Sequence, residues 1–317
     1  MISTQPLFTI ATITYNSGKW VRQAIESVLA STFTDFEYLI SDDNSADDTW
    51  AIIQQYNDPR IRAWRNESNK GEYPNRNTVL KKARGSYILY IDGDDILYKG
   101  TLRNLSEYIF AFPGVGMVWG VPHYDFIVFP VVFSPAQIFK IEFLGNYHWS
   151  MIGFPETVFK TALLLQSGGF SEEYAIGDYY IKKKLALHTQ VLLIPIGNAY
   201  WRVRKGQASQ NTGNNYRSLL ERYEIDSSIL NDNNFPLSSE ENAIARERLV
   251  RASAIQVFTN TISKGKIADF FMLRKKMRLR YYDFLKMFRK VKSNSKLGRS
   301  GENPIVTDYN FIKRPSV

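Results

Sequence analysis

The chain has 317 residues, enough for one large α/β domain with an appendage or for two domains, and its 44 % hydrophobic and 22 % charged residues are typical of a globular protein. The absence of cysteine excludes disulfides, thiol catalysis and cysteine-ligated zinc. The net charge of +9 is unevenly spread, because the segment from Lys264 to Arg299 is heavily basic and many of the acids lie in the first hundred residues.

The sequence indicates neither a secretory signal nor a transmembrane helix. The first eight residues lack a basic n-region and a long apolar h-region. The most apolar span, Val115 to Phe139, is interrupted by three prolines and an aspartate, which argues against a helix that crosses a membrane. We therefore expect a cytoplasmic protein.

The first hundred residues alternate between apolar, β-branched runs and segments with helical periodicity. In chain order this pattern predicts a strand at Leu7–Thr14, a helix at Lys19–Ala30 capped by Ser17, a strand at Phe36–Ser41, a helix capped by Asp47 or Ser45 that runs through Tyr56, a strand at Ile61–Trp64, a helix at Asn75–Ala83 and a strand at Tyr87–Ile91. Such alternation predicts an α/β fold with a mainly parallel sheet flanked by helices.

The alternation weakens after Tyr98. We expect helices at Thr101–Phe112, around Thr161–Gln166 and at Gly177–Leu187, a strand at Val191–Ile196, and polar then basic amphipathic helices from about Asn211 onward. These shifts predict one domain over residues 1–212, with halves at 1–98 and 99–212, and a helical, basic C-terminal extension over residues 213–317.

The strand expected at Tyr87–Ile91 ends in Asp92, Gly93, Asp94 and Asp95. Carboxylates clustered at the end of a buried strand are unfavourable unless a cation is bound there. Asp92 and Asp94 flank a residue without a side chain, so they can converge on one ion, and Mg²⁺ or Mn²⁺ suits oxygen ligands. An acidic turn in solvent is the alternative interpretation.

Polar clusters follow three of the predicted strands: Thr14-Tyr15-Asn16, Asp42-Asp43 and Asp92-Gly93-Asp94. Ligands of open α/β sheets bind outside the carboxyl ends of the strands. Because the three clusters fall at one edge of one sheet, they predict a single binding site.

These motifs together resemble the family 2, GT-A-fold, inverting glycosyltransferases, which transfer a sugar from a nucleotide-diphosphate donor. The resemblance covers roughly residues 7–210. Besides the three clusters it rests on Arg-Asn at 76–77, Gly-Gly-Phe at 168–170, Gly-Asp-Tyr-Tyr at 177–180 and Gly-Gln-Ala-Ser at 206–209. It implies a Rossmann-like, mixed, mainly parallel sheet whose first half binds the nucleotide sugar and whose second half binds the acceptor.

The resemblance assigns one group of residues to the donor, with a preference for a UDP-sugar. Asp42 or Asp43 would bind the base and ribose, and Mn²⁺ or Mg²⁺ at Asp92 and Asp94 would hold the diphosphate. The full donor set is Thr14, Tyr15, Asn16, Asp42, Asp43, Arg76, Asn77, Asp92, Gly93 and Arg204. Arg204 stands where the family commonly has a histidine, and we expect it to clamp phosphate. Two alternatives stay open: Asp43 caps a turn, or Arg76 is a surface ion-pair partner.

The resemblance assigns other residues to the acceptor side. Asp178 would be the general base that takes the proton of the acceptor hydroxyl, although an acid in the first turn of a helix is also favoured by the helix dipole alone. Gly169 and Phe170 would form the acceptor loop. Glu156 would contact acceptor hydroxyls, or it is a solvated strand residue.

The basic segment 264–299 combines apolar side chains with many lysines and arginines. It is suited to peripheral contact with an anionic membrane at its cytoplasmic face, as an enzyme with a lipid-linked saccharide acceptor would need, or to packing of its apolar face on the protein.

A nucleic-acid partner is excluded, because acids at three strand ends would repel a phosphate backbone. We expect a role in surface polysaccharide or glycoconjugate synthesis. A nucleotidyltransferase and an inactive sugar-nucleotide-binding scaffold are the alternatives.

Overall fold

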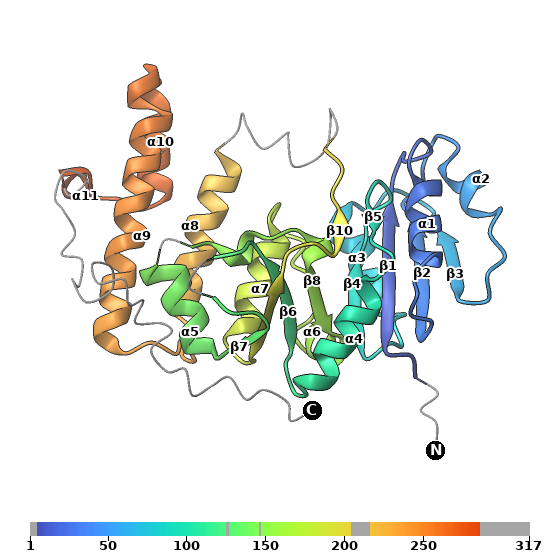
Figure 1. Cartoon of the computed structure of the whole chain (residues 1–317). Coiled ribbons are helices and arrows are strands. Elements are labelled where there is room, and N and C mark those ends of the chain that lie inside the picture. The colour runs from blue at the N-terminus through green and yellow to red at the C-terminus, as the bar shows by residue number, and fades with distance from the viewer. Residues whose placement is uncertain (1–4, 125–126, 146, 204–215, 286–317) are drawn as a thin grey trace.

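The computed structural model describes residues 5–124, 127–145, 147–203 and 216–285, and a mixed sheet lies at its centre (Figure 1). The eight strands of this sheet follow the order β3-β2-β1-β4-β8-β6-β9-β7. They are β1 (Phe8–Thr14), β2 (Phe36–Asp42), β3 (Ile61–Arg65), β4 (Tyr87–Tyr90), β6 (Met117–Val121), β7 (Val131–Phe133), β8 (Thr157–Lys160) and β9 (Val191–Pro195). Strands β1 to β4 run parallel, whereas β8 and β7 are antiparallel to their neighbours. The expected mixed, mainly parallel sheet is confirmed.

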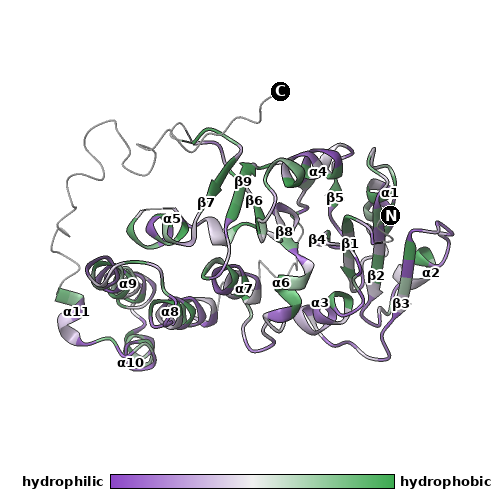
Figure 2. Ribbon diagram, turned by 90° about the horizontal axis from the view of Figure 1, so that it is seen from below, coloured by the Kyte–Doolittle hydropathy of each residue, from purple (hydrophilic) through white to green (hydrophobic). Residues whose placement is uncertain are grey.

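Helices cover both faces of this sheet (Figure 2). On one face lie α1 (Val21–Leu29) and α4 (Thr101–Ala111), and on the other lie α3 (Glu72–Leu80), α6 (Thr161–Gln166) and α7 (Gly177–Ala186). The remaining short helices before residue 160 are α2 (Thr49–Ile53), α5 (Pro135–Phe139), the π-helix η1 (Lys140–Leu144) and the 3₁₀ turns η2 (Trp149–Met151) and η3 (Phe154–Glu156).

A hydrophobic core lies on each face of the sheet, and β1 contributes to both, because successive side chains of a strand point to opposite faces. Ile10 packs in the cluster that contains α1 and α4, and Ala11 packs in the cluster that contains α3, α6 and α7. Because both faces are covered, all seven residues of β1 are buried, as the apolar, β-branched run in the sequence predicts.

A two-stranded antiparallel sheet of β5 (Ile96–Leu97) and β10 (Ala199–Tyr200) joins distant parts of the chain. It brings the residues near position 200 back beside the turn that follows β4. This pairing places the second half of the chain against the carboxyl edge of the first.

The C-terminal helices are α8 (Arg217–Leu230), α9 (Ser239–Asn260), the turn η5 (Ile262–Lys264), α10 (Ile267–Lys276) and α11 (Tyr281–Leu285). Helix α8 packs beside α7 and contributes Ile225 and Ile229 to the larger core, whereas α9, α10 and α11 form a separate small core around Val257, Leu273 and Phe284. The expected C-terminal helices are therefore present. No helix in the described part of the chain is long and apolar enough to span a membrane.

Helix α2 ends at Ile53, before the predicted end at Tyr56, and the starts of α1 and α3 also differ from the sequence prediction. The side chain of Ser17 does not cap α1; its carbonyl oxygen instead accepts from the backbone of Trp20 and Val21. Helix α3 begins at Glu72, three residues before the predicted start at Asn75. The reason is a long-range contact, because the carboxylate of Asp43 accepts from the backbone N–H groups of Lys70 and Gly71 just before the helix.

Candidate active site

The carboxyl ends of β1 and β4 touch, and this contact requires a glycine. Gly93 donates from its backbone to Ile13 at 3.1 Å. A Cβ atom at Gly93 would lie 2.4 Å from Oγ1 of Thr14, far closer than side-chain carbons pack. Thr14 Oγ1 is buried and has no hydrogen-bond partner in the described residues. The site therefore offers an unused polar atom next to the acidic turn.

The turn after β4 concentrates negative charge in a buried place. Asp94 and Asp95 are 7 % and 1 % exposed, and the Asp92 side chain keeps 31 % of its surface exposed. Burial raises the pKa of Asp95 to about 8, and the charge of Asp92 adds to this effect. Burial also raises the pKa of Asp92 to about 6, although the guanidinium of Arg76 opposes it.

The chemistry of this donor set fits a hard divalent cation. Asp92 and Asp94 supply carboxylate oxygens, which Mg²⁺ and Mn²⁺ prefer, and a cation would relieve the crowding of negative charge that raises these pKa values. No three histidine, aspartate or glutamate groups in the described residues form a metal-binding cluster. An ion held at Asp92 and Asp94 would thus share its coordination with phosphate oxygens of a substrate, which is usual for Mg²⁺.

Arg76 forms a buried ion pair with Asp92. Its Nη2 donates to both carboxylate oxygens at 2.8 and 2.9 Å and also contacts Glu72 at 3.1 Å. The guanidinium lies 3.6 Å from the ring centre of Phe154 and is 1 % exposed. The alternative that Arg76 is a surface ion-pair partner is therefore wrong. Burial acts to lower the pKa of Arg76, but the charges of Asp92 and Glu72 raise it above its ordinary value.

The two acids predicted to bind the nucleotide already have partners within the protein. Asp42 is fully buried, accepts from the backbone and hydroxyl of Ser45, and lies 3.3 Å from Nε of Arg65. Asp43 accepts from Asn66 Nδ2 at 2.7 Å, besides the backbone N–H groups that precede α3. Both carboxylates thus hold the loops around the site, and their contact with a base or ribose stays a prediction.

The loop after β1 is tied to the loop after β2. Asn16 donates from its backbone to Oγ of Ser45 at 2.9 Å, and its side-chain oxygen accepts from the backbone of Ala46 at 2.8 Å. Asn16 has φ of +50°, a conformation that asparagine tolerates well. Tyr15 is left 48 % exposed at this edge, so its ring is accessible to a planar ligand.

Asp178 lies in the first turn of α7 and faces α3. Its Oδ1 accepts from the hydroxyl of Tyr73 at 3.4 Å, and its Oδ2 lies 3.1 Å from Nζ of Lys182. The Lys182 side chain is 1 % exposed and also donates to the carbonyl of Ile152, whereas the Asp178 side chain is 24 % exposed. Two side chains therefore orient a carboxylate that stays accessible to a ligand.

Asn77 holds the predicted acceptor loop through the backbone. Its side-chain amide donates to the carbonyl of Phe170 at 2.9 Å and accepts from the N–H of the same residue at 2.8 Å. Gly169 has φ of +78°, and a Cβ there would lie 2.4 Å from Oδ1 of Asn77. The Phe170 ring is 2 % exposed in the core, so in this structure it supports the loop from within.

Glu156 is neither solvated nor directed at the surface. It is 8 % exposed and accepts from the backbone N–H groups of Gly197 and Asn198 at 3.0 to 3.3 Å. Burial raises its pKa. The interpretation of Glu156 as a solvated strand residue is wrong, because its carboxylate anchors the segment that leads into β10; an acceptor contact stays a prediction.

Arg202 is a site residue that the sequence analysis missed. Its backbone N–H donates to Oδ1 of Asp95 at 3.0 Å, its Nε donates to the carbonyl of Asp94 at 2.9 Å, and its guanidinium lies 4.2 Å from the ring centre of Trp20. No local pattern signals this contact, because 107 residues separate Arg202 from Asp95. Arg204, predicted to clamp phosphate, lies outside the described residues.

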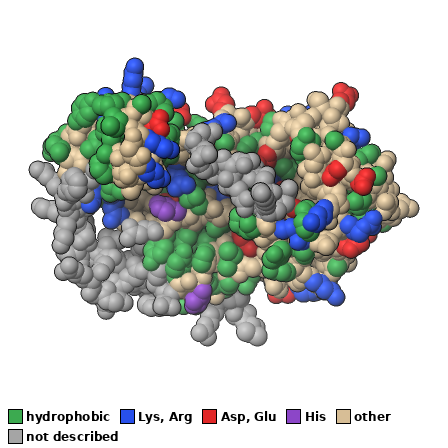
Figure 3. All heavy atoms as spheres, turned by 90° about the horizontal axis from the view of Figure 1, so that it is seen from above, with side chains coloured by type: hydrophobic (Ala, Val, Ile, Leu, Met, Phe, Trp, Pro, Cys, Tyr) green, Lys and Arg blue, Asp and Glu red, His purple; other side chains and the backbone are tan. Residues whose placement is uncertain are grey.

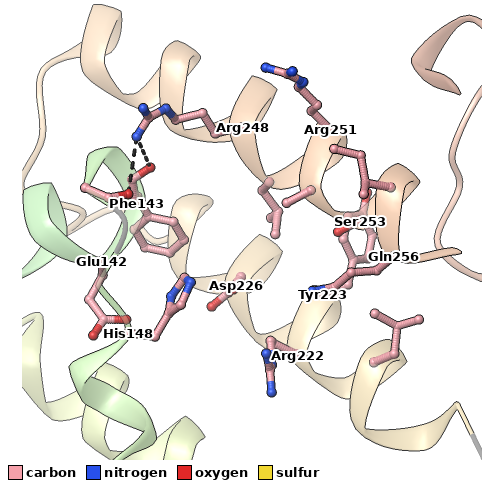
Figure 4. Close-up of a pocket in the computed structure, with 15 residues that line it drawn as sticks. Glu142, Phe143, His148, Arg222, Tyr223, Asp226, Arg248, Arg251, Ser253 and Gln256 are labelled. Carbon is pink, nitrogen blue, oxygen red and sulfur yellow. Dashed lines mark hydrogen bonds between the residues drawn. The ribbon is translucent and has the colours of Figure 1, made fainter. Parts of the chain in front are cut away.

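A separate cavity of about 380 Å³ lies between α8, α9 and η1, away from the predicted site residues (Figure 4). Its lining includes Arg222, Arg248, Arg251 and His148. Arg248 reaches the backbone carbonyls at the end of η1, and Figure 4 shows Arg222 and Arg251 pointing in opposite directions. These cations do not converge on one ligand group.

Residues 9–166 match the family described as Glycosyl transferase family 2. The chain belongs to this family. It is 28 % identical over 235 residues to the Escherichia coli UDP-Glc:alpha-D-GlcNAc-diphosphoundecaprenol beta-1,3-glucosyltransferase WfaP, with 70 % of this chain and 86 % of that protein covered. It is 33 % identical over 155 residues to the putative teichuronic acid biosynthesis glycosyltransferase TuaG of Bacillus subtilis, with 46 % of this chain and 62 % of TuaG covered.

Solved structures of other glycosyltransferases share the fold of this family 2 chain. Staphylococcus aureus TarS 1-349 in complex with UDP-GlcNAc gives a TM-score of 0.61 at 20 % identity, with 86 % of this chain and 91 % of that chain covered. The mannosyltransferase PcManGT of Pyrobaculum calidifontis, in complex with GDP-Man and Mn²⁺, gives 0.58 at 16 % identity, with 90 % and 88 % covered. The expected GT-A fold is confirmed.

Proposed function

We propose that this glycosyltransferase moves a hexosyl or N-acetylhexosaminyl group from a UDP-sugar to an acceptor hydroxyl with inversion at the anomeric carbon. The observation that carries the proposal is the placement of two carboxylate groups around α3. Arg76 on this helix binds Asp92 of the acidic turn, and Tyr73 contacts Asp178. The proposed donor site and the proposed base are thus both in contact with α3.

Asp92 and Asp94 are the residues that would hold Mn²⁺ or Mg²⁺. When bound, such an ion supplies positive charge that stabilises the leaving nucleoside diphosphate. The acidic turn itself is held by the close approach of Gly93 to Thr14 and by the hydrogen bonds of Arg202 to Asp94 and Asp95. The buried Arg76 guanidinium fixes the orientation of Asp92.

Asp178 is the proposed general base. Its carboxylate takes the proton from the acceptor hydroxyl while that oxygen bonds to the anomeric carbon and the bond from this carbon to the diphosphate oxygen breaks. Tyr73 and Lys182 limit the rotation of the carboxylate. The Gly169–Phe170 loop, held by Asn77, would border the acceptor.

The names of the relatives support the choice of substrates. WfaP is named for UDP-Glc and a diphosphoundecaprenol-linked acceptor, and TarS was crystallised with UDP-GlcNAc. TuaG is named for teichuronic acid biosynthesis. We therefore place this chain in surface polysaccharide or glycoconjugate synthesis, with a saccharide or lipid-linked saccharide as acceptor and a peripheral location at the cytoplasmic face of the membrane.

Calorimetric titration of the full chain with UDP, GDP and dTDP, each with Mn²⁺, Mg²⁺ or EDTA, tests the donor site. We expect UDP to bind only with a divalent ion, Asp94→Ala to abolish this binding, and Asp178→Ala to retain it. If only GDP binds, the donor is a guanosine-diphosphate sugar instead of a UDP-sugar. Absence of binding by all three nucleotides would contradict the proposal and favour a scaffold without catalysis.

A further inference from the structure

Helix α10 has two apolar sides, and only one of them faces the protein. Leu273 and Met277 are buried against α9 and α11, and Phe270 packs with Phe284 at 4.9 Å between ring centres. On the other side, Ile267 is 59 % exposed and Phe271 is 49 % exposed. Some of the apolar side chains of this segment are therefore buried in a core, and the others form an exposed outer face.

This outer face continues from α10 onto α11. The guanidinium of Arg274 lies 4.2 Å from the ring centre of Tyr281 and links the two helices. Tyr281 and Leu285 are 58 % and 67 % exposed. We call Ile267, Phe271, Tyr281 and Leu285 the outer apolar face. In Figure 3 hydrophobic side chains gather over the C-terminal helices with lysines and arginines at their edges.

The charge around this face is strongly positive. Residues 261–285 contain seven basic residues and two acids, which gives a net charge of +5. Six of the basic side chains are exposed: Lys264, Lys266, Lys275, Lys276, Arg278 and Arg280. Both acids have partners within the protein, since Asp269 accepts from the hydroxyl of Tyr216, and Asp283 accepts from the backbone of Arg280 and pairs with its guanidinium at 3.5 Å.

The charge decides which partner fits the outer apolar face. A second copy of the chain would bring another +5 against it, and residues 286–317 carry eight basic residues and two acids, a net charge of +6. Both would repel the basic rim. An anionic bilayer attracts it, and each lysine or arginine near such a surface strengthens binding.

We propose that the outer apolar face docks on an anionic lipid bilayer. Ile267, Phe271 and Leu285 enter the boundary between head groups and acyl chains, Tyr281 lies at the head-group level, and the basic rim binds lipid phosphates. Figure 3 shows the hydrophobic side chains over the C-terminal helices from above, which is the side toward which β1 runs from the N-terminus in Figure 1. Docking would thus turn the candidate site toward the membrane surface, and only this link to a lipid-linked acceptor rests on the proposed function.

Flotation of the full chain with phosphatidylglycerol–phosphatidylcholine vesicles and with pure phosphatidylcholine vesicles tests the docking. We expect binding to the anionic vesicles alone, weakened by high salt. The double variant Ile267→Ser/Phe271→Ser should bind roughly tenfold more weakly. The matched control is Phe110→Ser on α4, a phenylalanine that is 68 % exposed elsewhere on the molecule and should leave binding unchanged.

Lys275→Glu/Lys276→Glu provides a second variant, which should reduce binding to the anionic vesicles without changing the thermal unfolding temperature. Equal flotation of the parent and the Ile267→Ser/Phe271→Ser variant would overturn the proposal. Light scattering that shows a dimer in the parent and a monomer in this variant would assign the face to self-association instead. UDP binding is measured on each sample, so a protein that binds UDP but not vesicles refutes the docking and leaves the proposed function standing.

Discussion

Tyr73 and Arg76 lie one turn apart on α3 and contact carboxylates from opposite halves of the chain. Arg76 donates to Asp92 at 2.8 Å, and the hydroxyl of Tyr73 lies 3.4 Å from Oδ1 of Asp178. Because residues three positions apart share one side of a helix, α3 can fix the spacing between the acidic turn and the proposed base. The following predictions test the parts of this arrangement.

Replacing Arg76 by alanine should destabilise the protein by about 3 kcal/mol, because it leaves Asp92 without its buried partner. Urea denaturation measures the change in the free energy of unfolding. Arg60→Ala is the matched control, since Arg60 pairs with Asp58 at 2.8 Å but with side chains 26 % and 23 % exposed. The Arg60→Ala variant should lose less than about 1 kcal/mol in the free energy of unfolding. Equal losses in the two variants would contradict the buried role of Arg76.

Gly93→Ala should separate the ends of β1 and β4, because its Cβ would meet Thr14 Oγ1 at 2.4 Å. We expect a loss of about 2 kcal/mol in stability and weaker UDP binding by calorimetry. Gly100→Ala is the control, since nothing lies within 4 Å of a Cβ at that position. A Gly93→Ala protein that binds UDP as the parent does would show that this contact is not needed for the donor site.

Tyr73→Phe removes a hydroxyl that contacts Asp178 and donates to the carbonyl of Ala175. We expect kcat for donor turnover to fall roughly tenfold while the KM for the donor stays the same, because only the orientation of the base changes. Tyr56→Phe removes a surface hydrogen bond to Glu26 and should leave both constants unchanged. A higher KM without a change in kcat would place Tyr73 in donor binding instead.

Stability without metal should fall as the pH rises. Burial raises the pKa of Asp95 to about 8 and that of Asp92 to about 6, whereas an unfolded aspartate titrates near pH 4, about its ordinary value. The folded protein therefore holds protons that the unfolded chain has lost. The stability from these groups is complete below about pH 4 and is lost as the pH passes through about 6 and 8.

Thermal unfolding in EDTA between about pH 5 and pH 9 measures this dependence. The unfolding temperature should fall across the range, and Asp95→Asn should flatten the curve. Mn²⁺ should raise the unfolding temperature most at the alkaline end, because it stabilises the ionised carboxylates. A temperature that rises with pH in EDTA would show that the acidic turn is not held protonated.

The sequence predicted the elements that depend on local pattern. Strand β1 was readable because every residue is buried, and α6 was predicted with its observed bounds at Thr161–Gln166. The acidic turn was equally visible, since Gly93 and the three aspartates are contiguous. These features need only neighbouring residues to be recognised.

The partners of the site residues could not be predicted, because they arise from tertiary contacts. Arg76 and Asp92 are 16 residues apart, and Glu156 lies 41 residues from Gly197, whose backbone it accepts from. Lys182 had a weak local signal, since it follows Asp178 by four positions on a helix. The outer apolar face could not be predicted either, because the sequence of α10 does not show which of its apolar side chains are buried in the core and which are exposed.

The most direct test of the central claim is the configuration of the sugar that the enzyme releases from α-linked UDP-glucose or UDP-N-acetylglucosamine when water replaces the acceptor. Proton NMR early in the reaction, with Mn²⁺ removed before measurement, should show the β anomer first, and Asp178→Asn should abolish its formation while UDP still binds. Release of the α anomer first, or an unchanged rate in Asp178→Asn, would contradict inversion with Asp178 as the base.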